Sequence, residues 1–110
     1  MTTPELLQSW ERTRAFLRDA TNNLSEFAQT EYFGDTVQIE EYIEHNELGL
    51  AFDVLESIAI GSYWESSLML ENLALAAANM GLTDKVQALD EKIGKLRGSK
   101  HKTRLPSTDT

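Results

Sequence analysis

The sequence contains no cysteine and only two prolines, and no uninterrupted apolar run approaches the length of a membrane-spanning helix. Without cysteine, the chain can form neither a disulfide framework nor a thiolate zinc site, and it offers no thiol nucleophile. A helical membrane span needs about 18 or more consecutive apolar residues, so we expect none. The first residues lack the basic and apolar parts of a secretory signal, and we therefore expect a cytoplasmic protein.

Positive charge is also scarce in this chain. Ten lysines and arginines stand against 18 aspartates and glutamates, which gives a net charge of −8 at pH 7. A surface with this average charge repels nucleic acid and anionic membranes and attracts basic partners. We therefore expect the chain to bind neither nucleic acid nor membranes directly.

The hydrophobic pattern indicates an all-α fold. Proline occurs only at positions 4 and 106, so no helix between them is interrupted by proline. Apolar residues at spacings of three and four predict helices over residues 4–33, 35–45, 47–60, 66–80 and 83–97. Thr3 is expected to cap the first of these helices, with Pro4 at its first position. We expect an antiparallel bundle of four to five helices in a single domain over residues 1–98, with a weak spot in the first helix at Asn22 and Asn23.

The expected core follows from the same spacing. The first helix should bury one face, made by Leu6, Trp10, Leu17, Ala20, Leu24 and Phe27, with Thr13 between them. The segments 47–60 and 66–80 are apolar around most of their circumference and should lie centrally. In the first of these segments we expect one buried stripe, made by Leu48, Ala51, Phe52, Leu55, Ile58 and Ala59. Gly81 and Gly98 suit helix ends, and a narrow apolar seam over 83–97 could pair with a second copy of the chain. Residues 99–110 are expected to form a flexible basic tail.

Residues with the spacing of a catalytic or metal site are not found. The two histidines, His45 and His101, are far apart in the sequence, and the chain contains no His-x-x-x-His or Glu-x-x-His motif that would place two ligands on one helix face. The glycines are isolated, so there is no phosphate-binding loop, and there is no nucleophile elbow. We therefore expect no enzyme activity, no cofactor and no metal, although a pocket formed only in the fold is not visible in one sequence.

Residues 34–60 contain the most unusual charge pattern, because they hold seven acidic residues and no lysine or arginine. One interpretation is a solvated face that aids solubility. The other is a docking surface for a basic partner, since such a surface raises association rates and selects the partner by charge. On the second interpretation we expect the contact residues to be Glu40, Glu41, Glu44, Glu47, Asp53 and Glu56, flanked by the aromatic residues Tyr63 and Trp64. Tyr42 could also anchor a partner, but we favour its packing against the core or a loop.

Residues 40–55, which read EEYIEHNELGLAFDVL, carry a resemblance to a known family. Together with the junction at Met80, Gly81 and Leu82, this segment resembles the small helical immunity proteins of bacterial toxin systems, of the Maf and contact-dependent growth inhibition types. The resemblance extends from Val37 to Leu96. It implies a protein that binds and neutralises the C-terminal domain of a secreted toxin, and we expect a basic nuclease such as an RNase or tRNase.

Alternatives to this interpretation remain open from the sequence. A helical adaptor or chaperone-like module would hold a partner's amphipathic helix in an apolar groove, with weak salt dependence. The oligomeric state is not determined by the sequence, and a monomer is favoured. Gly49, within the segment of resemblance, is expected to allow two helices to approach closely, with Glu47 facing outward.

Overall fold

The computed structural model describes residues 3–61, 67–98 and 100–103, and 83% of these residues are helical. They form the helices α1 (Pro4–Asn22), α2 (Glu26–Glu31), α3 (Phe33–Glu44), α4 (Leu48–Gly61), α5 (Ser67–Asn79) and α6 (Thr83–Arg97). Within these ranges no strand occurs, so the prediction of an all-α fold is confirmed. None of the helices described is both long and apolar enough to cross a membrane.

The described residues form six helices and not the expected four to five, because the segment 4–33 does not form one helix. Helix α1 begins as expected, with the Thr3 hydroxyl accepting a hydrogen bond of 3.1 Å from the Leu6 amide. It ends at Asn22, close to the expected weak spot. The Ser25 hydroxyl then accepts a hydrogen bond of 3.1 Å from the Ala28 amide and starts α2. Because the Ser25 side chain caps a new helix after the break, this segment forms two helices in place of one.

The break changes which residues of this region are buried. Thr13, Leu17 and Ala20 are buried in α1 as expected. Phe27 was expected in the core, but it is 59% exposed, and Ala28 is buried in its place. The new helix start shifts the helical phase, so the spacing counted from α1 no longer applies. Leu6, in the first turn of α1, is also exposed, contrary to the prediction.

Helix α3 begins earlier than the expected start near residue 35. The Thr36 amide donates to the Tyr32 carbonyl at 2.9 Å, and the Thr36 hydroxyl donates to the Phe33 carbonyl at 2.8 Å. Gly34 therefore lies in the first turn of α3 and not between two helices, so the predicted start of this helix was wrong. A glycine is tolerated here because the first turn makes few of the intrahelical hydrogen bonds.

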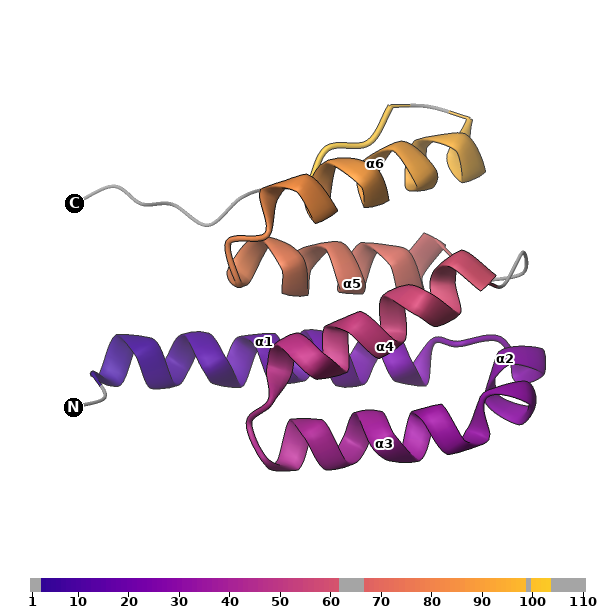
Figure 1. Ribbon diagram of the computed structural model, residues 1–110. Coiled ribbons are helices and arrows are strands. Elements are labelled where there is room, and N and C mark those ends of the chain that lie inside the picture. Colours follow the sequence, from indigo (N-terminus) through magenta and orange to yellow (C-terminus); the bar gives the residue numbers. More distant parts are fainter. Residues whose placement is uncertain (1–2, 62–66, 99, 104–110) are drawn as a thin grey trace.

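Helices α4 and α5 supply most of the core, as the sequence predicted. The buried residues of α4 are those of the expected stripe, namely Leu48, Ala51, Phe52, Leu55, Ile58 and Ala59. Helix α5 lies between α1 and α6 and packs against both, while α4 crosses α1 and packs on α3 (Figure 1). The alanines of α5 at positions 74 and 76–78 are buried, which lets these neighbours approach closely.

The apolar seam of α6 is used within the chain. Val86, Leu89 and Ile93 are buried, and α6 packs extensively against α5. These three side chains therefore contribute to the core and are not a free face for a second copy of the chain. Leu96, the last residue of the expected seam, is 51% exposed.

Candidate functional site

The connection between α3 and α4 is a tight corner. The Glu47 amide donates to the Tyr42 carbonyl at 2.7 Å, and the Asn46 amide donates to the Ile43 carbonyl at 3.1 Å. Asn46 has a φ of 58°, in the left-handed region that this pattern of helix termination requires. Asparagine is one of the few residues other than glycine that adopt this region readily. The corner therefore places Glu47 directly after the end of the acidic helix α3.

A second corner of the same type joins α5 to α6. The Leu82 amide donates to the Ala77 carbonyl at 2.9 Å, and Gly81 has a φ of 76°. The prediction that Gly81 ends the helix is therefore confirmed. Both corners lie at the same end of the molecule, at the left in Figure 1.

A shallow, open hollow of about 580 Å³ lies between the two corners. Its lining combines apolar and acidic side chains from the start of α4 with one residue of the second corner: Asn46, Glu47, Leu48, Gly49, Leu50, Asp53 and Leu82. Leu50 and Leu82 are exposed at 47% and 36%, so the walls present apolar surface to solvent. Glu47 and Asp53 are exposed beside them. The structure thus brings two of the expected contact residues to one hollow, which the sequence did not indicate.

Gly49 lies in the first turn of α4 and is exposed. A Cβ atom at this position would have no other atom within 4 Å beyond the helix's own backbone and the two neighbouring residues. No helix approaches closely there, so the expected role of Gly49 in helix packing was wrong. The glycine instead leaves the wall of the hollow without a side chain.

The acidic residues of α3 face a base from α1. Arg18 makes an ion pair with Glu40, with Nη2 of the arginine 2.8 Å from Oε1 of the glutamate. The hydrogen bonds and charge of Glu40, with a smaller effect of the Glu44 charge, raise the pKa of Arg18, while partial burial opposes the shift. Part of the negative charge of α3 is therefore neutralised within the chain.

The acidic residues of α4 face a base from α6. Lys85 makes an ion pair with Glu56, with 2.9 Å between Nζ and Oε1. The hydrogen bond to Glu56 and its charge raise the pKa of Lys85, and the charges of Asp53 and Asp84 act in the same direction. Glu56 is half-buried, and of the expected contact residues it is the least available to a partner.

The other expected contact residues of the stretch are solvent-exposed. Glu41, Glu44, Glu47 and Asp53 are exposed, and no ion pair holds any of them in the described part of the chain. Together they extend from the last turns of α3, through the first corner, to the second turn of α4. We refer to these four side chains as the acidic corner. Tyr63 and Trp64, the expected flanking aromatics, lie outside the described residues.

Tyr42 and His45 are positioned by local contacts. Tyr42 is half-buried and packs against the core, as expected, and its hydroxyl accepts a hydrogen bond of 3.0 Å from Gln38. His45 Nδ1 lies 2.8 Å from the carbonyl oxygen of Glu41, at the end of α3. Within the described ranges, no group of three or more histidine, aspartate or glutamate side chains is arranged to hold a metal ion.

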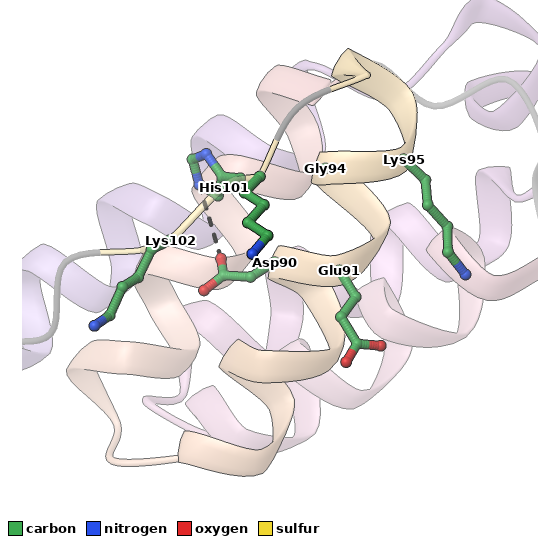
Figure 2. Close-up of a pocket in the computed structure, with 7 residues that line it drawn as sticks. Asp90, Glu91, Gly94, Lys95, His101 and Lys102 are labelled. Atoms are coloured by element: carbon green, nitrogen blue, oxygen red, sulfur yellow. Dashed lines mark ion pairs between the residues drawn. The ribbon is translucent and has the colours of Figure 1, made fainter.

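A second hollow lies along α6, where residues 100–103 return beside the helix (Figure 2). Asp90 accepts hydrogen bonds from the amide and the hydroxyl of Thr103, and its carboxylate lies 3.7 Å from His101 Nε2. Thr103 is buried by this contact. Sequence reasoning assigned these residues to a flexible tail, and nothing in the local pattern indicated the contact, because the partners are separated by about a dozen positions.

Comparison with known proteins identified no relative of this chain. No protein-family model matches the chain, and no match was found among curated proteins or among solved structures.

Proposed function

We propose that this chain is a binding protein of the immunity type, which neutralises a basic toxin domain in the cytoplasm by covering it with the acidic corner. The observation that carries the proposal is the distribution of charge in the fold. Two bases that meet the acidic stretch, Arg18 and Lys85, form ion pairs with Glu40 and Glu56. The four side chains of the acidic corner are left exposed.

Such a surface suits a partner that must bind phosphates. A nuclease active site is basic because it holds a polyanion, and carboxylates presented by an inhibitor experience the same attraction. Electrostatic steering raises association rates toward roughly 10⁸–10⁹ M⁻¹s⁻¹, which suits an inhibitor that must act before the toxin does. The resemblance of residues 40–55 to toxin-immunity proteins supports the same function. In this proposal the chain has no catalytic role and acts as a monomer.

The proposal predicts that a neighbouring gene encodes a secreted protein, and the test is co-expression of this chain with the C-terminal domain of that protein. We expect the domain alone to stop growth, and growth to recover when the chain is present and forms a complex with it. A toxic domain that the chain neither binds nor counteracts would refute the proposal.

The mode of binding is tested by charge reversal. The variant Glu41→Lys/Glu44→Lys should protect poorly, whereas Glu26→Lys/Glu31→Lys, with the same change in net charge at α2, should protect like the unmodified chain. Helix α2 lies at the opposite end of the molecule from the acidic corner (Figure 1), which makes it a suitable control position. Equal loss of protection by both variants would mean that only net charge matters. A helical adaptor that grips an apolar helix would lose little in either variant.

A further inference from the structure

The hollow between the two helix corners has a chemical character that points to one kind of occupant. Leu50 and Leu82 expose apolar surface on it, and Glu47 and Asp53 stand beside them without an ion pair in the described part of the chain. We infer that this hollow receives a lysine or arginine side chain of the protein partner. The inference rests on the proposed function and identifies where an anchoring residue of the toxin domain would be held.

A long cationic side chain is complementary to both features of the lining. Lysine and arginine have an apolar stem of three or four methylene groups and a charged end. The stem can cover Leu50 and Leu82 while the charged end lies between the carboxylates of Glu47 and Asp53. A purely apolar occupant would remove water from these carboxylates without compensation, which is unfavourable. An anionic occupant would be repelled by them.

The described part of the chain does not supply such a cation itself. The charge of Lys85 interacts with that of Asp53, but the ion-pair partner of Lys85 is Glu56. Arg14 approaches the corner from the α1 side, where its Nη2 donates a hydrogen bond of 2.9 Å to the Asn46 side chain. It does not line the hollow. In the described part of the chain no ion pair holds Glu47 or Asp53, so both carboxylates are available to a base of the partner.

Gly49 is consistent with an occupant that approaches closely. Glycine is the least favourable helix residue apart from proline, and no contact in the described structure requires it at this position. The absence of a side chain leaves space beside Leu50 for atoms of a partner. Gly34 offers a matched comparison, because it is also exposed, lies in the first turn of α3 and would have no atom within 4 Å of an added Cβ.

The first test uses short blocked peptides as probes of the isolated chain. Acetyl-Gly-Arg-Gly-amide is titrated into the labelled protein, and backbone amide shifts are followed by NMR. Saturable shifts should appear at Gly49, Leu50 and Leu82, and the same peptides with norleucine or glutamate in place of arginine should produce much smaller shifts. The inference would be overturned if the norleucine peptide caused amide shifts as large as those caused by the arginine peptide. It would also be overturned if the arginine peptide shifted the amides of α2 as much as those of the hollow.

The second test fills the hollow. Gly49→Met should weaken binding of the arginine peptide by at least about fivefold, the loss expected when a central contact is removed. The control Gly34→Met should not change it. In the complex with the toxin domain, Gly49→Met should likewise raise the dissociation constant relative to Gly34→Met.

The two proposals fail in different ways. If Gly49→Met binds the toxin domain normally while Glu41→Lys/Glu44→Lys does not, the hollow is not the anchoring site and the proposed function stands. If the chain gives no protection in co-expression, the proposed function fails, whatever the peptide titration shows.

Discussion

The guanidinium of Arg14 in α1 donates a hydrogen bond of 2.9 Å to the side-chain oxygen of Asn46, the left-handed residue that joins α3 to α4. Asn46 therefore has two roles, since its backbone forms the corner and its side chain ties the corner to α1. Arg14 is half-buried, and its Nε, unlike its Nη2, has no hydrogen-bond partner in the described structure. This contact joins the corner between α3 and α4 directly to α1.

Substitutions at Asn46 should separate these two roles. Asn46→Ala loses the hydrogen bond and places an alanine in the left-handed region, so we expect a loss of about 2 kcal/mol in the free energy of unfolding. Asn46→Gly loses only the hydrogen bond and should be more stable than the alanine variant by about 1 kcal/mol. Urea unfolding of both variants provides the measurement. Equal stability of the two would contradict a backbone role.

A buried polar contact between α1 and α5 should show energetic coupling. Asn79 Nδ2 donates to Thr13 Oγ1 and to the Ser9 carbonyl, each at 2.8 Å, and Thr13 is buried. Each of the variants Asn79→Ala and Thr13→Val should destabilise the fold by about 1–2 kcal/mol, because a buried polar group loses its partner. The double variant should cost less than the sum of the single ones. Strict additivity in a double-mutant cycle would show that the two side chains do not act together.

The pair of Lys85 and Glu56 should make stability depend on alkaline pH. Glu56 raises the pKa of Lys85 above its ordinary value of 10.5, so the folded state binds this proton more tightly than the unfolded state. The stabilisation is therefore complete below pH 10.5 and is lost as the pH rises through the folded-state pKa. The melting temperature of the unmodified chain should fall more between pH 9 and pH 11.5 than that of Glu56→Gln. Parallel falls would mean that the pair has no such effect.

Association of the proposed complex should depend on ionic strength. Salt screens exposed charges, with a Debye length of about 10 Å at 0.1 M, so the association rate should fall steeply as salt is added. Glu41→Lys/Glu44→Lys should slow association strongly at low salt and flatten this dependence while the helical circular dichroism spectrum stays unchanged. Stopped-flow measurements at several salt concentrations provide the rates. A rate that is insensitive to both salt and charge reversal would favour an apolar docking groove.

The contact of residues 100–103 with α6 should be visible in proteolysis. Asp90 accepts both hydrogen bonds from Thr103, so Asp90→Ala should release the segment, and trypsin should cleave after Lys100 and Lys102 several times faster. Glu91→Ala, at the neighbouring position of α6, is the control and should cleave like the unmodified chain. If both variants are cleaved at the unmodified rate, Asp90 does not hold this segment.

Local signals in the sequence predicted some elements closely. Thr3 with Pro4 marked the start of α1, and the helix expected over residues 83–97 has those ends in the structure. The buried stripe of α4 was read correctly from its spacing. These features depend on neighbouring residues in the same helix, which are visible in a linear sequence.

Other features depended on a competing local signal or on contacts between distant segments. Phe27 was placed in the core because its spacing continued that of α1, but a cap at Ser25 changed the helical phase. Gly49 was assigned to helix packing, and only the absence of a neighbour in space shows otherwise. The sequence also did not show which acids are neutralised, because Arg18 and Lys85 lie 22 and 29 positions from their partners.

Local propensity, capping and composition were sufficient to predict the helical class, the ends of several helices and the base-free acidic stretch. They did not reveal which carboxylates are paired, where Leu82 meets the start of α4, or how two similar corners flank an apolar hollow with acidic sides. Those properties arise from helix packing, which brings together residues that no sequence spacing relates.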